Sequence, residues 1–302
     1  MSSWNGGFGI VPFVAEQADA LKAQGVEIDF FGVIGHGLGY FKNIKLLNKK
    51  IREYHPDIIH AHYGLSGLLA NLQRRIPVVT TFHGSDIHLG GLVLRLSKIA
   101  YRLSAYNIFV AEDIFKQAKA SEVRATILPC GINLDGIVSM PREEARRQMG
   151  LSLDEKIVLF SSSFTNEVKN YPLAKAAMEK VKGVKLVEMK GFNRHQVCLM
   201  MNAANCLLMT SHREGSPQVV KEAMACGTPV VSVDVGDVGH VILGTKGCYI
   251  AKREPDDIAD KIKMALNYVG KTDGHQRILD LGLSNELVAK QLIGIYKLIL
   301  ER

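Results

Sequence analysis

Residues 206–230, CLLMTSHREGSPQVVKEAMACGTPV, decide the fold because they join a buried strand to a short helix through a polar turn. The apolar run 206–209 is typical of a strand in a parallel sheet. Ser216 is a favourable N-cap, Pro217 suits the first helical position, and Gly227 followed by Pro229 predicts a stop. We therefore predict a helix over 217–225 that begins at the carboxyl edge of a parallel sheet.

The turn before this helix carries the residues expected of a phosphate and polyol site. The N–H groups and positive dipole end of a helix N-terminus suit a phosphate, and Gly215 lets a ligand approach the backbone. Glu214 and Glu222 repel phosphate, so we expect them to accept hydrogen bonds from hydroxyls on either side of it. A diphosphate between two polyols is a nucleotide-sugar. The competing interpretation is a capped surface helix with two solvated glutamates.

Apolar β-branched runs alternate with amphipathic runs along most of the chain, which predicts an α/β protein with two doubly wound, Rossmann-like halves. A segment rich in Pro, Gly, Asn and Asp at 129–136 interrupts this alternation. We expect an N-terminal acceptor-binding domain over 1–137, a C-terminal donor-binding domain over 138–286, and a last helix over 287–302 that crosses back to the first domain. A strand is predicted at 26–33, whereas the first strand is expected to be missing or shortened.

Composition narrows the classes of partner. The 302 residues carry a net charge of +7, which favours anionic partners such as phosphates. The sequence has no zinc-finger spacing or RNP-like motif and only 7% aromatic residues, so we expect no nucleic-acid partner. No apolar run approaches ~18 residues, the first residues lack the pattern of a signal peptide, and the five cysteines form no CxxC pair. We therefore expect a cytoplasmic protein.

Two basic amphipathic stretches, 41–52 and 92–102, lie in the first half. Mixed basic and apolar faces favour peripheral contact with an anionic membrane that carries a lipid-linked acceptor, and such contact places the protein at the inner membrane face. Ordinary helices with an apolar inner face and solvated lysines show the same pattern.

Several motifs together resemble the family 4 retaining glycosyltransferases of GT-B fold, which have two Rossmann-like domains facing across a cleft. Glu214 and Glu222, separated by seven residues, resemble the donor-site signature of that family. Four weaker motifs follow the family's order: NGG at 5–7, TFHGSD at 81–86, LPCGIN at 128–133 and KN at 169–170. The resemblance covers residues 5–230 and implies transfer of a hexose from a UDP- or GDP-linked sugar to a glycan, a lipid-linked acceptor or another glycoconjugate.

The resemblance also implies a role for each matching residue. Glu222 is expected to bind the ribose hydroxyls, Glu214 a hydroxyl of the transferred sugar, and Lys169 the diphosphate. His83 is expected near the sugar, which makes His83 and Glu214 the candidate catalytic residues. The remaining candidates are donor-site residues (Gly6 and Gly7 at the leaving phosphate; Gly215, Ser216, Pro217 and Gln218 at sugar and phosphate) and acceptor-side residues (His62 and Asp86).

The chain departs from the family pattern at Ser163, where an arginine is usual, so Arg213, Lys190 and Arg194 are alternatives for the missing charge. The sequence contains no DxD motif, and the resemblance implies that lysine and a helix dipole stabilise the leaving group, so we expect no metal and no cofactor. His60, His62 and His83 could imitate a zinc site, but no carboxylate or cysteine at ligand spacing accompanies them. Retention by front-face attack is favoured over double displacement, because no second carboxylate near the sugar serves as nucleophile.

Two alternatives remain open on the sequence. One keeps the fold and changes the reaction, to a nucleotide-sugar 2-epimerase or a phosphorylase. The other is a non-catalytic GT-B subunit that binds nucleotide without turnover, and it is motivated by Ser163 and by the short first strand.

Overall fold

The computed structural model describes residues 2–3, 10–34 and 42–301, and it divides into two compact units. Unit 1 comprises Met1–Gly131 and Asn285–Arg302, and unit 2 comprises Ile132–Ser284. The division falls earlier than the boundary expected after residue 137, because Ile132 is fully buried in the core of unit 2 and Leu134 and Ile137 pack against the same cluster. The last helix, α14 (Asn285–Leu300), is part of unit 1.

The larger sheet of unit 1 is four-stranded and parallel. Its order is β3 (Ile59–His62), β4 (Val78–Phe82), β5 (Tyr106–Phe109) and β6 (Ala125–Ile127). The helices that connect or follow these strands are α3 (Gly64–Asn71), α4 (Ser85–His88), α5 (Gly91–Leu103) and α6 (Glu112–Ala118). All five residues of β4 are buried, as expected for a central strand covered on both faces.

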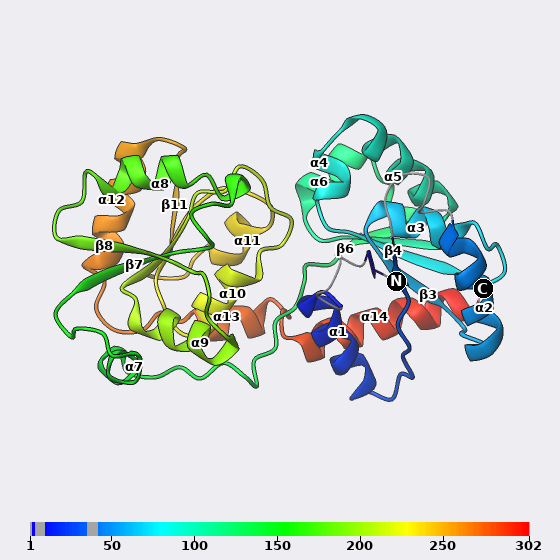
Figure 1. Cartoon of the computed structure of the whole chain (residues 1–302), viewed down its shortest axis with the longest axis horizontal. Helices are drawn as coiled ribbons and strands as arrows, with labels where there is room; N and C mark the ends of the chain where they lie inside the picture. Colours follow the sequence, from blue (N-terminus) through cyan, green and yellow to red (C-terminus); the bar gives the residue numbers. More distant parts are fainter. Residues whose placement is uncertain (1, 4–9, 35–41, 302) are drawn as a thin grey trace. The chain divides into compact units, whose positions relative to one another are not determined.

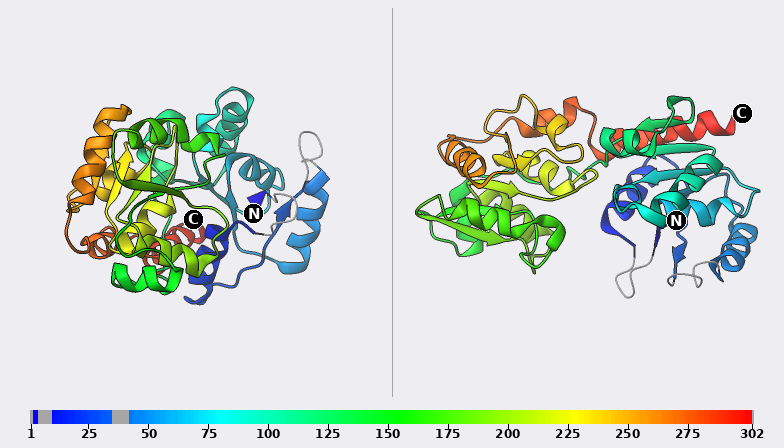
Figure 2. Two further views of the ribbon diagram at one scale, coloured as in Figure 1. Left: turned by 60° about the vertical axis from the view of Figure 1, so that its left-hand side comes forward. Right: turned by 90° about the horizontal axis from the view of Figure 1, so that it is seen from above.

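Helices cover both faces of this sheet (Figures 1 and 2). On one face, α1 (Pro12–Lys22) and α14 pack with the strands through Leu21, Val79, Ile108 and Leu292. On the other face, α2 (Asn43–Tyr54) and α3 pack through Leu47, Ile51, Ile59 and Ala70. The apolar pattern of α14 is thus explained by docking on the sheet of unit 1.

The start of unit 1 forms a separate two-stranded parallel sheet of β1 (Ser2–Ser3) and β2 (Gly32–Val33). The first strand, expected to be missing or shortened, has two residues. The prediction of a strand over 26–33 is wrong for residues 26–31, which make no ladder. Their side chains nevertheless alternate, since Val26 and Ile28 pack on the α1 and α14 cluster and Phe31 packs on the α2 cluster.

Unit 2 contains a five-stranded parallel sheet (Figure 1). Its order is β11 (Tyr249–Ala251), β10 (Val230–Val233), β9 (Cys206–Met209), β7 (Lys156–Phe160) and β8 (Val184–Glu188). Ile157 and Leu159 pack with α9 (Arg194–Ala203) and α10 (Gln218–Ala225), whereas Val158 and Phe160 pack with α8 (Tyr171–Met178) and α12 (Pro255–Leu266). The other helices of unit 2 are α7 (Arg142–Met149), α11 (Val238–Ile242), α13 (Gly274–Asp280) and the 3-10 turn at Glu167–Lys169. A further 3-10 turn, Glu122–Arg124, belongs to unit 1.

Helix α10 begins one residue later than predicted. Its N-cap is Pro217, which makes no side-chain capping bond, so the assignment of Ser216 as N-cap is wrong. The Ser216 hydroxyl instead donates to Asp237 Oδ2 at 2.6 Å. The predicted stop is confirmed, because Gly227 has a φ of +69° directly after the helix.

No helix in the described ranges 10–34 and 42–301 is long and apolar enough to cross a bilayer.

Candidate active site

Lys169 and Glu214, assigned to one site by the sequence, are in contact in unit 2. Lys169 Nζ lies 2.6 Å from Glu214 Oε1, and the two side chains are only 16% and 14% exposed. The turn that carries Lys169 is fastened to the end of β9, since Thr210 Oγ1 donates to the carbonyls of Lys169 and Asn170. Asn170 itself has a φ of +53°, which Asn tolerates better than most residues. The turn at Glu167–Lys169 therefore places a cation on the candidate sugar-binding carboxylate, which the loop after β9 carries.

Glu222, a buried residue of α10, makes a second ion pair. Arg194 Nη1 lies 2.7 Å from Glu222 Oε1, and the Glu222 side chain is 11% exposed. Arg194 is the first residue of α9, whose start is fixed by a capping box between Asn193 and Gln196. Of the three alternatives for the missing arginine, Arg194 is thus the one that the structure joins to a candidate donor-site residue.

Ser163 stands where the family pattern has arginine, and it is held by a carboxylate of its own. Ser163 Oγ donates to Glu188 Oε2 at 3.1 Å, and the backbone N–H of Phe164 donates to the same oxygen at 2.8 Å. The hydrogen bond from Phe164 lowers the pKa of Glu188 below its usual value. An arginine at position 163 would place its charge beside this carboxylate.

A buried ion pair, which the sequence did not reveal, fixes the loop before α10. Lys221 Nζ lies 2.8 Å from Asp237 Oδ2, and the two side chains are 0% and 5% exposed. Lys221 also contacts the Ser216 hydroxyl, while the Asp237 N–H donates to the Gly215 carbonyl at 3.0 Å. Gly236 has a φ of +59°, and a Cβ there would collide with that same carbonyl. Because Lys221 belongs to an amphipathic helix, the sequence pattern predicts that its side chain is exposed to solvent.

In unit 1, Asp86 fixes the turn that carries His83. Its carboxylate accepts backbone N–H groups from Gly84 at 2.9 Å, Gly64 at 3.0 Å and His83 at 3.3 Å. Burial raises the pKa of Asp86 to about 6, although these hydrogen bonds act in the opposite direction. Gly84 has a φ of +109°, a conformation that requires glycine. The expected acceptor-side residue is therefore engaged in holding the turn.

His60, His62 and His83 form a stacked cluster on the face of the sheet that α1 and α14 cover. His62 Nδ1 lies 3.0 Å from His83 Nε2, while His60 contacts the Tyr296 hydroxyl at 2.6 Å and Thr81 Oγ1 at 2.7 Å. Burial lowers the pKa of His60 and His83 to about 3, and it lowers that of His62 well below its usual value. The cluster is therefore neutral at physiological pH.

The structure describes no metal-binding group of three or more His, Cys, Asp or Glu side chains within 10–34 and 42–301. The ring nitrogens of His60 are engaged by Tyr296 and Thr81, and His62 and His83 bond each other. Gly6 and Gly7, the expected leaving-phosphate residues, lie outside the described residues.

Both halves of the chain match known glycosyltransferase domains. Residues 9–135 match Glycosyltransferase Family 4, and residues 155–268 match Glycosyl transferases group 1. The chain belongs to glycosyltransferase family 4. The expected α/β class is confirmed, and the fold is GT-B. Sucrose-phosphate synthase from Thermosynechococcus elongatus has a similar structure, with a TM-score of 0.81 at 19% identity over 95% of this chain and 92% of the other. HepE from Anabaena, solved with UDP and glucose, gives a TM-score of 0.74 at 16% identity over 97% of both chains.

Two bacterial relatives of this chain are also named glycosyltransferases. The putative teichuronic acid biosynthesis glycosyltransferase TuaC of Bacillus subtilis is 27% identical over 245 residues, which cover 72% of this chain and 63% of TuaC. The D-inositol 3-phosphate glycosyltransferase of Mycobacterium avium is 25% identical over 255 residues, which cover 68% of this chain and 60% of that protein. The chain thus spans less than two thirds of these two family members.

Proposed function

We propose that this chain is a retaining hexosyltransferase. It transfers a sugar from a UDP- or GDP-linked donor, bound by unit 2, to a glycan, lipid-linked or other glycoconjugate acceptor bound by unit 1. The observation that carries the proposal is the pair of ion pairs beside α10, Lys169 with Glu214 and Arg194 with Glu222. The solved complex of HepE with UDP and glucose supports the class of donor.

The ion pairs support an exchange of partners when the donor binds. A diphosphate attracts the Lys169 ammonium more strongly than one carboxylate does, since it carries more charge. The departure of Lys169 frees Glu214 to accept a hydrogen bond from a sugar hydroxyl. Glu222 remains beside Arg194, which keeps its charge compensated, and accepts hydrogen bonds from the ribose hydroxyls. The eight-residue helix α10 directs its positive dipole end toward this loop.

Chemistry at the sugar then follows from charge stabilisation. Lys169 and the N-terminus of α10 stabilise the negative charge that develops on the leaving phosphate, without a metal ion. We propose front-face attack, in which a leaving phosphate oxygen accepts the proton of the acceptor hydroxyl as the new glycosidic bond forms on the face that the phosphate leaves. His83, neutral because of its burial, serves as a hydrogen-bond donor near the sugar and not as a fixed cation.

The first experiment is calorimetric titration of the purified chain with UDP, GDP and ADP and with their hexose conjugates, in EDTA and again in Mg²⁺. Saturable binding of the UDP or GDP series in EDTA is expected. Binding that appears only with Mg²⁺ would contradict the metal-free proposal, and the absence of all binding would support the non-catalytic alternative.

A Lys169→Ala variant tests the diphosphate role against Lys175→Ala, which removes an exposed lysine on α8. Affinity for the bound nucleotide is expected to fall about tenfold or more in Lys169→Ala, which is the scale of a charged hydrogen bond. It is expected to change little in Lys175→Ala. Equal affinities would contradict the assignment. Nucleotide release only in the presence of an acceptor then separates a transferase from a 2-epimerase or a phosphorylase.

Helix α5 supports contact with an anionic membrane at the inner face. Its exposed surface combines the apolar Leu92, Ile99 and Leu103 with the basic Arg95 and Arg102. Sedimentation with phosphatidylglycerol vesicles is expected to capture the chain. Arg95→Glu with Arg102→Glu is expected to reduce capture at least about tenfold. Lys246→Glu with Lys252→Glu, the same charge change on unit 2, is the control, and equal losses in both variants would contradict a specific role of α5.

A further inference from the structure

Two cysteines of unit 2 lie side by side, and the proposed transfer reaction uses neither of them. Cys198 belongs to α9, Cys226 directly follows the last residue of α10, and their sulfur atoms are 3.9 Å apart. Both side chains are part of one core cluster, whereas Cys206 is buried in the cluster on the other face of the sheet. The fold therefore brings together two thiols that are 28 positions apart in the sequence.

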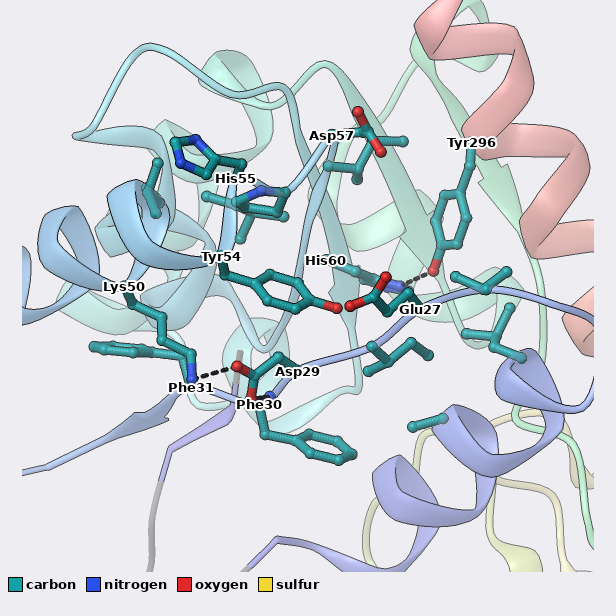
Figure 3. Close-up of a pocket in the computed structure, with 18 of the residues that line it drawn as sticks. Glu27, Asp29, Phe30, Phe31, Lys50, Tyr54, His55, Asp57, His60 and Tyr296 are labelled. Atoms are coloured by element: carbon teal, nitrogen blue, oxygen red, sulfur yellow. Dashed lines mark hydrogen bonds and ion pairs between the residues drawn. The ribbon is translucent and has the colours of Figure 1, made fainter.

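The cavity of unit 1 offers no nucleophilic pair of this kind. It has a volume of about 390 Å³ and lies beside β3, α2 and α14. Two polar pairs on its walls, Asp29 with Lys50 and His60 with the Tyr296 hydroxyl, are in contact with each other (Figure 3). No cysteine is among the described residues that line this cavity, so the thiol pair of unit 2 is a separate feature.

The thiol pair lies one helical turn from the ion pair between Arg194 and Glu222. Arg194 and Cys198 are four positions apart on α9, and Glu222 and Cys226 are four positions apart at the end of α10. The Cys226 N–H donates to the Glu222 carbonyl at 3.0 Å. Residues four apart share one face of a helix and are separated by about 5.4 Å along its axis. The two helices therefore meet twice, through the ion pair and, one turn later, through the sulfur atoms.

The surroundings make Cys198 the more reactive of the two thiols. Its side chain is 8% exposed, whereas that of Cys226 is fully buried. The hydrogen bond from the Cys226 thiol lowers the pKa of Cys198 to about 6, while the same bond and burial raise the pKa of Cys226. The Asn202 amide donates to the Cys198 sulfur at 3.7 Å. Because the thiolate is the reactive form of cysteine, Cys198 is suited to react first and Cys226 to respond.

We propose that Cys198 and Cys226 form a reversible disulfide when a hydroperoxide reaches Cys198, and that this bond fixes α9 to α10 beside the ion pair of Glu222. Two of the chain's cysteines would then act as a modification site and not only as packing residues. Disulfides of proteins in reducing compartments are usually transient and redox-sensing, which is consistent with a reversible bond of this kind.

The chemistry balances with hydrogen peroxide as the oxidant. The Cys198 thiolate attacks one peroxide oxygen, the O–O bond breaks, and the second oxygen leaves as water after it takes up a proton, so Cys198 becomes a sulfenic acid. The Cys226 sulfur then attacks the Cys198 sulfur, the S–O bond breaks, and the hydroxyl leaves with the Cys226 proton as a second water. The two thiols lose two electrons, which the peroxide accepts. An external dithiol reverses the bond by exchange.

The disulfide would also change the geometry of the proposed donor site, and this consequence rests on the proposed function. A disulfide has an S–S distance of about 2.05 Å, so the two sulfur atoms must approach each other from 3.9 Å. Arg194 and Glu222 lie one turn away on the same helices and shift with the thiols. Because a binding site tolerates displacements of only about 0.5 Å, we expect the disulfide to weaken binding of a nucleotide-sugar.

Peroxide treatment of the whole chain tests the disulfide without reference to activity. The chain is treated with hydrogen peroxide, the excess is removed with catalase, and peptides are mapped without reduction. We expect one cross-linked pair of peptides that joins Cys198 to Cys226, and its loss after dithiothreitol. The Cys248→Ala variant, which removes a different thiol of unit 2, is expected to form the same bond. No cross-link between these two positions, or a cross-link of either to another cysteine, would overturn the proposal.

The order of the two steps is tested with single variants and dimedone, which labels sulfenic acids. In Cys226→Ala, peroxide is expected to give a dimedone label on Cys198, because the second thiol is missing. In Cys198→Ala, no label is expected on Cys226. A label on Cys226 that matches the one on Cys198 would overturn the assignment of Cys198 as the first thiol to react.

Calorimetry then tests the link to the donor site. The reduced and the oxidised chain are titrated with the UDP or GDP conjugate that the reduced chain binds. Affinity is expected to be at least about threefold lower in the oxidised chain and to return after dithiothreitol, whereas peroxide should leave the affinity of Cys198→Ala unchanged. Equal affinities of the reduced and the disulfide-bonded chain would overturn the link to the donor site. A reduced chain that binds no nucleotide would instead contradict the proposed function, and the mapped disulfide would stand.

Discussion

Each unit holds a loop of candidate site residues with a buried aspartate, but the two units compensate the charge of that aspartate in different ways. In unit 2, Asp237 is matched by the buried ammonium of Lys221 and fastens the loop at Gly215. In unit 1, Asp86 is matched by three backbone N–H groups and fastens the turn at His83. The difference extends to the surroundings, because the unit 2 site is built from ion pairs and the unit 1 site from neutral histidines.

This contrast has a physical consequence. The cation of an ion pair can exchange a carboxylate for a phosphate and so keep an anionic partner, which suits a donor site. A neutral buried cluster depends on staying unprotonated, so its stability depends on pH. The two units are therefore expected to respond differently to charge removal and to acid.

The largest expected effect is on stability, and it concerns the buried ion pair between Lys221 and Asp237 in unit 2. Lys221→Met leaves Asp237 without its cation and is expected to destabilise unit 2 by about 3–5 kcal/mol, measured by urea unfolding. The double variant Lys221→Met with Asp237→Asn is expected to recover much of that loss, since no unpaired charge remains. A single variant as stable as the original chain would mean that Asp237 is not charged or not buried in solution, and would remove the contrast between the units.

The proposed ribose-binding carboxylate, Glu222, gives the next largest expected effect. Glu222→Ala is expected to lower affinity for the bound nucleotide-sugar about tenfold or more while leaving the chain folded. Glu179→Ala, at an exposed position of the same unit, is the matched control. Calorimetry that finds the two variants alike would contradict a ribose-binding role for Glu222.

Acid is expected to weaken unit 1 before unit 2. His60 and His83 have a pKa of about 3 in the folded chain against an ordinary 6.5, so the unfolded chain binds more protons between these values. The stability they confer is present above pH 6.5 and is lost as the pH falls toward 3. Asp86, with its pKa raised to about 6 from 3.8, acts oppositely, because its burial costs stability as the pH rises through that range.

Pulse hydrogen exchange during urea unfolding at pH 7.5, 6.5 and 5.5 reports each unit separately. We expect the urea midpoint of unit 1 to fall more steeply with decreasing pH than the midpoint of unit 2. The His83→Gln variant is expected to make the pH dependence of the unit 1 midpoint less steep. Parallel slopes in the two units, or an unchanged slope in the variant, would show that the histidines are not the acid-sensitive group.

The smallest effect is expected at Ser163. Ser163→Ala removes one hydrogen bond to Glu188 at a half-buried position and should cost at most about 1 kcal/mol. Nucleotide affinity should change by less than roughly twofold. A larger loss of affinity in calorimetry would give Ser163 a direct role at the donor and would sharpen the account of the missing arginine.

Much of the fold could be predicted from the sequence, because buried parallel strands and amphipathic helices have distinct periodicities. The strands at 206–209 and 230–233 and the stop at Gly227 follow from local patterns alone. At the candidate site, the resemblance to the family motifs assigned Lys169 and Glu214 to the same donor site. Arg194 was one of three alternatives, and only its contact with Glu222 distinguishes it. The glycines at 6 and 7 stay predictions.

What the sequence by itself determined is therefore the α/β class, the two halves and the chemistry of the loop before α10. Only the tertiary structure decided which hydrogen bonds and ion pairs the polar side chains make. The hydroxyl of Ser216 could cap its own helix, but it donates instead to Asp237, which the loop after β10 supplies. Residues 26–31 have the alternation of a strand, yet a strand also needs a backbone neighbour, which lies elsewhere in the sequence. Periodicity is local, whereas hydrogen-bond partners and charge compensation depend on contacts between distant segments.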